Sequence, residues 1–266
     1  MAREATVEPR TLTRKPLVEA ILELRWQLFQ RNQHEPPHDP GFRIAIGRFY
    51  DKIRTEYSLM VDLPAAQIPE DVTPHVVRHQ FRAAKDGWPL AQLGPGILTV
   101  NDTEGYTWDS FRPRLLSAFD AIREAYPSEV HPFSPIDIQL RYINAIPLPE
   151  ENPDPTVFLQ DLLHTGVKVD PLLGEMPREV RLDLAFALTQ PTATGMLTFA
   201  TGRHKEKPSI ILQLTIGAKD KDTPSNRDSF SAWVDQAHTV IDRWFFTLCR
   251  GALLNTFEGS NDTQHA

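Results

Sequence analysis

The chain has 266 residues, of which 41% are hydrophobic and 24% charged, and its formal net charge is −7. This is the composition of a globular protein, and no apolar stretch reaches the roughly 20 residues that a membrane-spanning helix needs. The single cysteine, Cys249, excludes an internal disulfide framework and favours a reducing compartment, so we expect a cytoplasmic protein without a membrane partner.

Residues 1–130 are predicted to form a β-α-β-β-α unit. From Leu17 to Phe29, apolar residues alternate with polar ones, which is the period of a strand with one buried face. A helix, two strands joined by a tight turn and a second helix are predicted next, at 42–57, 75–82, 90–100 and 111–122. We expect Asp109 or Ser110 to cap the second helix, with Pro113 in its first turn.

Residues 131–266 are predicted to repeat this order with one more strand, as a β-α-β-β-β-α unit. The opening strand covers Ile136 to Ile146, and Asp154-Pro155 begins a helix with aspartate as its cap. Three strands and a long helix with an aromatic stripe follow, at 180–188, 196–201, 209–216 and 230–248. The repeated order predicts an α+β fold, in which duplicated units form a mainly antiparallel sheet with helices packed on one face. The two halves are expected to form one continuous domain or two domains.

The alternation of the strands supplies most of the candidate site residues. Apolar residues of the first strand, Val18 among them, are expected to face the helices, which places Glu19, Glu23 and Arg25 on the opposite side of the sheet. The same alternation places Arg141 of the second opening strand there. We expect these charged side chains to converge near the middle of the molecule. They form either solvated ion pairs or a site where the arginines bind a small anionic ligand or a protein partner.

Motif searches leave little beyond these residues. The prolines around His34 and His38 forbid a helix that would bring this pair onto one face, so we expect no metal site there. We expect none at His75 with His79 either, because no cysteine and no convergent carboxylate accompanies them. No complete nucleotide-binding motif or nucleophile elbow is present, so no cofactor is expected. Among the histidines, His238 is the candidate for a functional role, because it directly follows Ala237, one of the apolar stripe residues of the long last helix. It either projects into a pocket or has a structural role.

Five segments spread over nearly the whole chain carry a resemblance. They are Lys15-Pro16-Leu17-Val18-Glu19-Ala20-Ile21; Gln92-Leu93-Gly94-Pro95 with Leu98, Val100 and Asn101; Tyr106, Trp108 and Phe111; Leu140-Arg141-Tyr142-Ile143-Asn144; and Ala237-His238 with Ile241 and Phe245. Together they resemble a family of uncharacterised bacterial proteins described as sporadically distributed. The resemblance implies an intracellular prokaryotic protein without an assigned activity, of a kind common in mobile islands and in defence or toxin-antitoxin loci. It implies no catalytic residue.

We therefore expect a non-enzymatic interaction or ligand-sensing protein of a bacterial locus, with phage defence as one setting and a partner encoded nearby or a small anionic ligand. Two alternatives stay open. Tandem β-α-β-β-α units also build the CRISPR repeat-processing endoribonucleases, although the net charge of −7 opposes contacts with RNA phosphates and makes a nucleic-acid partner unexpected. A small-molecule hydrolase would need Glu19 or Glu23 to meet His238 in a pocket. The sequence leaves the oligomeric state open.

Overall fold

The computed structural model describes residues 12–103, 105–149, 154–168, 170, 172, 174 and 177–258. The elements of the first half are β1 (Leu17–Trp26), α1 (Phe42–Ile53), β2 (Leu59–Asp62), β3 (His79–Arg82), β4 (Leu90–Gly94), β5 (Ile97–Asp102) and α2 (Trp108–Ala125). Those of the second half are β6 (Pro135–Pro147), α3 (Pro155–Asp161), β7 (Arg181–Thr189), β8 (Thr192–His204), β9 (Lys207–Lys219), α4 (Arg227–Leu248) and α5 (Ala252–Glu258). Two 3₁₀ turns are described as well, Pro64–Gln67 and Asp220–Asp222.

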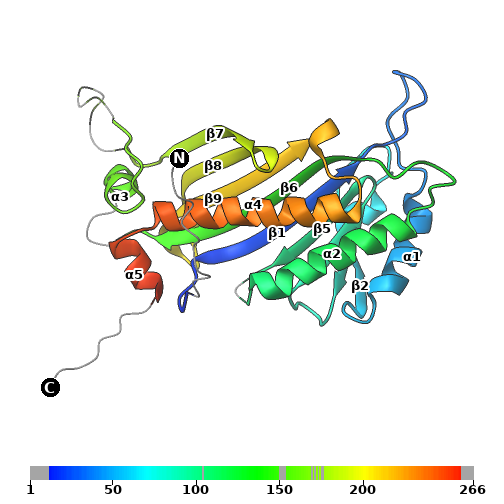
Figure 1. Ribbon diagram of the computed structural model, residues 1–266, viewed down its shortest axis with the longest axis horizontal. Helices are drawn as coiled ribbons and strands as arrows, with labels where there is room; N and C mark the ends of the chain where they lie inside the picture. The colour runs from blue at the N-terminus through cyan, green and yellow to red at the C-terminus, as the bar shows by residue number, and fades with distance from the viewer. Residues whose placement is uncertain are drawn as a thin grey trace.

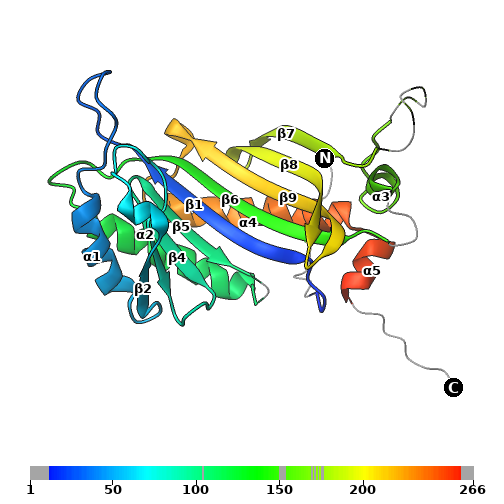
Figure 2. The same ribbon diagram turned by 180° about the vertical axis from the view of Figure 1, so that it is seen from behind.

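The strands form a nine-stranded sheet in the order β2-β3-β4-β5-β1-β6-β9-β8-β7. Every pair of neighbours is antiparallel, and the two halves of the chain meet where β1 pairs with β6. Helices α2 and α4 lie side by side across one face of this sheet (Figure 1), and the strands stand in front of them when the molecule is seen from behind (Figure 2). The predicted α+β class with a mainly antiparallel sheet is confirmed.

The first half contains more strands than predicted. Strand β2 was not predicted, and 90–100, predicted as one strand, is the hairpin of β4 and β5. The chain turns at Pro95 and Gly96, where Gly96 has a φ of 72°, a conformation that favours glycine. The start of α2 also differs, because Thr107 is its cap and Pro113 stands one turn deeper than predicted. The second half follows the predicted order and adds α5.

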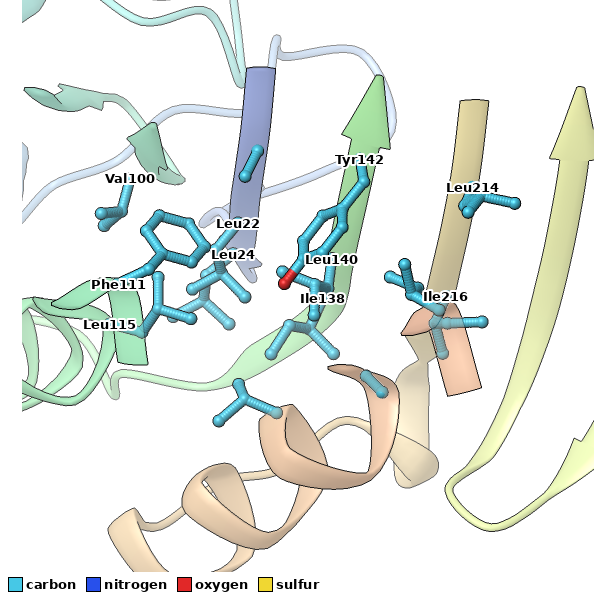
Figure 3. Packing of buried hydrophobic residues seen from close by; sticks show 14 of the residues in the cluster. Leu22, Leu24, Val100, Phe111, Leu115, Ile138, Leu140, Tyr142, Leu214 and Ile216 are labelled. Carbon is cyan, nitrogen blue, oxygen red and sulfur yellow. The ribbon is translucent and has the colours of Figure 1, made fainter. Parts of the chain in front are cut away.

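Helices α2 and α4 run antiparallel and are joined along their length. Near one end, Arg112 forms an ion pair with Asp235, with Nε and Oδ1 2.6 Å apart. Further along, the rings of Phe119 and Phe230 stack with centroids 4.1 Å apart. The hydrophobic core lies between this pair of helices and the sheet, and Figure 3 shows part of it, with labelled residues Leu22, Leu24, Val100, Phe111, Leu115, Ile138, Leu140, Tyr142, Leu214 and Ile216.

The alternation predicted for β1 holds from Ala20 onward. Leu22 and Leu24 are buried in the core, so the residues between and after them point to the other side of the sheet. The register between β1 and β6 shifts between Leu17 and Glu19. Leu17 therefore belongs to the core and Val18 does not, which corrects the prediction for Val18.

Gly94, at the end of β4, lies against the backbone of Val76 and Val77, in the segment that precedes β3. A Cβ atom at this position would overlap the carbonyl oxygen of Val76 and would stand 2.7 Å from its carbonyl carbon. Backbone atoms cannot move aside as a flexible side chain can, so only glycine fits without displacing this segment.

Gly94→Ala is expected to lower the free energy of unfolding by about 1 to 3 kcal/mol, the usual effect of forcing an extra methyl group into a packed site. Gly47→Ala is the matched control, because nothing lies within 4 Å of a Cβ at that exposed position of α1. The control is expected to stabilise the protein by about 0.5 to 1 kcal/mol, since alanine is the better helix former. Urea denaturation of both variants measures the contrast, and equal effects would contradict the close approach of this backbone to Gly94.

Candidate functional site: a cavity between helices and sheet

Four of the five predicted site residues lie on the face of the sheet that points away from α2 and α4. Glu19, Glu23 and Arg25 alternate with the buried residues of β1, and Arg141 does so on β6. His238 lies on α4, on the other side of the sheet. The structure therefore places the four charged residues of the strands on one face of the sheet, with Glu19 and Arg25 six residues apart along β1, and His238 on the other face.

On the outer face, opposite charges are paired with each other. Glu23 links the two predicted arginines, with Oε1 2.7 Å from Nη2 of Arg25 and Oε2 3.8 Å from Nη2 of Arg141. Glu19 is turned toward β5, where its Oε1 accepts a hydrogen bond of 2.8 Å from Nδ2 of Asn101. These contacts match the alternative of ion pairs on an outer face. A partner-binding role for the same residues stays a prediction.

On the helix side, a cavity of about 290 Å³ lies between the start of β1, the N-terminus of α2 and the second half of α4. Apolar atoms form most of its wall, and its apolar and aromatic lining residues include Leu12, Pro16, Leu17, Trp108, Leu214, Phe245 and Phe246. Its polar side chains are Lys15, Tyr106, Thr107, Asp109, Tyr142, Asn144, His238 and Asp242. A mostly apolar hollow with a few convergent polar groups is the usual form of a small-molecule site.

Three elements bring the polar side chains together. The side chain of Thr107 accepts a hydrogen bond of 3.2 Å from the backbone N–H of Ser110 and so begins α2, which places Tyr106 and Trp108 on either side of the cap. Tyr142 points from β6 to the helix side of the sheet, as Figure 3 shows. His238 and Asp242 are four residues apart on α4 and therefore share one face of that helix.

The polar groups form a hydrogen-bonded chain across the cavity wall. The hydroxyls of Tyr106 and Tyr142 are hydrogen-bonded to each other, and the hydroxyl of Tyr142 lies 2.9 Å from Nδ1 of His238. Nε2 of the same ring is 3.6 Å from Oδ2 of Asp242. All of these contacts are satisfied when Tyr142 donates to Nδ1 and the ring carries its proton on Nε2, directed at the carboxylate. The indole of Trp108 stacks on the imidazole, with centroids 3.9 Å apart.

Burial shifts the titration of each member of this chain. It lowers the pKa of His238 to about 4, so the imidazole is neutral at pH 7. It raises the pKa values of Tyr106 and Tyr142 well above their usual value of 10, which keeps both hydroxyls protonated. Asp242 stands at the mouth of the cavity with 48% of its side chain exposed, and burial of the remainder raises its pKa to about 6.

Sequence reasoning found only His238 among these groups. Lys15, Tyr106, Trp108 and Tyr142 belong to segments that carry the family resemblance, but nothing in the sequence indicated that those segments meet. Asp242 was missed, although its spacing of four residues from His238 places both side chains on one helical face. That spacing was the available signal, and a search for polar pairs on the core helix would have found it.

Neither a metal site nor a membrane span is found in the part of the chain that the structure describes. No three histidine, cysteine, aspartate or glutamate side chains there are grouped so as to hold a metal ion. His238 and Asp242 alone would give two ligands, fewer than metal sites in proteins normally use. Likewise, no described helix is both long enough and apolar enough to cross a bilayer.

Comparison with known proteins adds no functional assignment to this geometry. No protein-family model matches the chain, and no curated protein matches it.

Proposed function

We propose that this protein is a non-enzymatic ligand-sensing protein, and that it binds a small molecule in the cavity between α2, α4 and the sheet. One observation carries the proposal: an apolar and aromatic cavity of about 290 Å³ contains a hydrogen-bonded chain of Tyr106, Tyr142 and His238. Such polar groups fix the orientation of a ligand, while the apolar wall supplies the contact area.

The titration of the cavity residues favours binding over catalysis. A general acid or base works best with a pKa near the working pH. Burial moves His238 in the opposite direction, to a pKa of about 4, and moves the pKa values of the two tyrosines further above 10. At neutral pH these three groups are hydrogen-bond partners that neither accept nor release a proton readily.

Asp242 supports a second candidate, a small-molecule hydrolase. Burial raises the pKa of Asp242 to about 6, which is closer to pH 7 than the usual value of an aspartate. A pKa near the working pH suits a general acid or base. The carboxylate of such an enzyme would then come from α4. Glu19 and Glu23, the carboxylates expected to work with His238, lie on the other side of the sheet. The endoribonuclease alternative gains no support, because positive charges on the outer face alternate with negative ones.

Four further proposals rest on the sequence. We propose that the chain is a member of the sporadically distributed bacterial family and acts in the cytoplasm with the products of a defence or mobile-island locus. We also propose that its halves derive from one duplicated unit, which the sheet order supports, since β5-β1 and β9-β6 occupy matching places on either side of the centre. The charged outer face around Arg25 and Arg141 is the surface we propose for a protein partner.

Filling the cavity is expected to abolish ligand binding without unfolding the protein. Leu12 is partly buried at the cavity wall, so Leu12→Trp places an indole in the hollow. Leu172, which is 94% exposed, supplies the matched control Leu172→Trp. Ligands are first found by thermal shift against a metabolite library and are then measured by calorimetry. Their binding to Leu12→Trp should be at least about tenfold weaker, as expected when a ligand loses its apolar pocket, and their binding to Leu172→Trp should be unchanged.

Two other outcomes have clear meanings. If every hit binds the filled variant as tightly as the wild-type protein, the cavity is not the binding site. If a ligand is converted to a product during the titration, and Asp242→Asn stops the conversion, the hydrolase candidate replaces the sensing function.

A further inference from the structure

The wall of the cavity carries more negative than positive charge. Asp109 and Asp242 are carboxylates, Lys15 is the single ammonium among the lining residues, and His238 is neutral at pH 7. The Nζ of Lys15 donates a hydrogen bond of 2.6 Å to the main-chain oxygen of Tyr106, and its charge offsets part of the rise that burial causes in the pKa of Asp102.

Asp242 has no cation beside it within the described residues. The only basic side chain there that comes within 4.0 Å of its carboxylate is His238, at 3.6 Å, and that imidazole is uncharged. The rise in the pKa of Asp242 has desolvation as its cause, with no opposing charge. A partly desolvated carboxylate without a counter-charge gains more from a bound cation than a solvated surface carboxylate does.

Aromatic rings surround the same hollow. The lining contains Tyr106, Trp108, Tyr142, Phe245 and Phe246, so the wall comes from the segment before α2, from α2, from β6 and from α4. The faces of aromatic rings carry negative potential and attract ammonium groups, most strongly where water is excluded. The rings and the carboxylate therefore favour the same charge in a ligand.

Besides Lys15, a second feature of the cavity that would favour an anion is offset by neighbouring groups. The N-terminus of α2 brings the positive end of a helix dipole to the wall. Thr107 caps that end by accepting a hydrogen bond from the N–H of Ser110, and Asp109 adds a negative charge in the first turn. The helix end is thus supplied with both an acceptor and a counter-charge from its own residues.

We propose that the ligand of this cavity is a small organic cation, an amine or a quaternary ammonium compound, whose charged group lies beside Asp242 and whose apolar part contacts the aromatic wall. This assignment rests on the proposed function, that the cavity binds a small molecule. The hydrogen-bonded chain of Tyr106, Tyr142 and His238 then offers acceptor and donor atoms to a polar group elsewhere on the ligand.

Three probes of nearly equal shape separate charge from size: choline, its neutral analogue 3,3-dimethylbutan-1-ol, and the anion 3,3-dimethylbutanoate. In calorimetry with the full chain at pH 7.5, choline is expected to bind at least about tenfold more tightly than the alcohol, a difference typical of cation recognition by aromatic rings and a carboxylate. The carboxylate probe is expected to bind most weakly.

Asp242→Asn is expected to remove the preference for choline and to leave the affinity for the alcohol unchanged. Asp228→Asn is the matched control, because it removes the same charge from the first turn of α4, at the other end of the helix. It should preserve the preference.

Choline affinity is also expected to fall as the pH drops through about 6, because protonation of Asp242 removes its charge. The titratable and charged groups that share the cavity are His238 on the same helix, Lys15 before β1, Tyr106 before α2, Asp109 on α2 and Tyr142 on β6. His238 gains its proton only near pH 4, so it remains neutral over this interval. In Asp242→Asn, affinity should be independent of pH between about 5 and 7.5, because the titrating carboxylate is gone.

The outcomes distinguish this inference from the proposed function. If the alcohol or the carboxylate binds as tightly as choline, or if Asp242→Asn keeps the preference, the cation assignment is wrong while binding in the cavity stands. If none of the three probes binds the wild-type protein more tightly than it binds Leu12→Trp, the cation assignment fails, and the metabolite library alone then decides whether the cavity binds a small molecule.

Discussion

Replacing Asp39 by alanine is expected to lower the free energy of unfolding by about 3 to 5 kcal/mol, because four buried donors lose their acceptor together and each would cost about 1 to 3 kcal/mol if left unpaired. Only 3% of Asp39 is exposed. Its Oδ2 accepts hydrogen bonds from Nε1 of Trp26 and the N–H of Gly96, both at 2.9 Å. Its Oδ1 accepts from the N–H of Gly41 at 3.0 Å and from the hydroxyl of Tyr126 at 2.6 Å.

This carboxylate joins four separate parts of the chain: the end of β1, the turn between β4 and β5, the start of α1 and the end of α2. Urea denaturation of Asp39→Ala measures its contribution. Asp51→Ala is the control, because the carboxylate of Asp51 is exposed on α1 and lies 3.8 Å from Arg54, and such surface pairs contribute only about 0 to 1 kcal/mol. A loss below about 1 kcal/mol in Asp39→Ala would mean that water replaces the carboxylate at little cost.

Phe230→Ala is expected to lower the free energy of unfolding by about 3 to 5 kcal/mol, the usual range for truncating a buried phenylalanine. Phe230 is fully buried, and its ring stacks on that of Phe119, which is 1% exposed, with an interplanar angle of 12°. The pair fills the contact between α2 and α4, so its loss opens a void between the two helices that cover the sheet. Chemical denaturation provides the measurement.

Two comparisons make the Phe230 result specific. Ile44→Ala removes a side chain of similar character that is 43% exposed on α1, and it is expected to cost less than about 1 kcal/mol because little apolar area is buried there. The double variant Phe119→Ala with Phe230→Ala should cost less than the sum of the two single changes, since both rings line the same void. Strict additivity would mean that the stacked pair does not act as a unit.

The hydrophobic period of the sequence predicted those elements whose buried face can be identified from their own residues. β1 and β6 alternate, and α4 carries a stripe every three or four residues, so each was recognised with its buried side correct apart from the bulge at Val18. In the run from Leu90 to Val100 all but one of the residues are buried, so the hairpin of β4 and β5 was missed although Gly94-Pro95-Gly96 is a turn signal. Such runs carry no period.

The candidate site was recognised only in part, because it depends on contacts between distant segments. His238 was singled out from its place on α4, whereas its partner Tyr142 is 96 residues away in the sequence. The hydrophobic periods of β6 and α4 do not indicate that β6 passes beneath that part of α4. Asp39 was not singled out for the same reason. An aspartate in a proline-rich segment is normally solvated, and only the fold brings four donors to this one.

The position of β1 has a consequence for the order in which the molecule assembles. This strand lies near the beginning of the chain and yet occupies the middle of the sheet, between β5 and β6. During synthesis, the first half can close on itself through β1 and β5, but one edge of β1 stays unpaired until residues 135–147 have been made. Pairing between strands so far apart in sequence is slow, and an unpaired edge is a surface on which nascent chains associate. The seam at the centre of this sheet therefore closes only after the first half of the chain has been made.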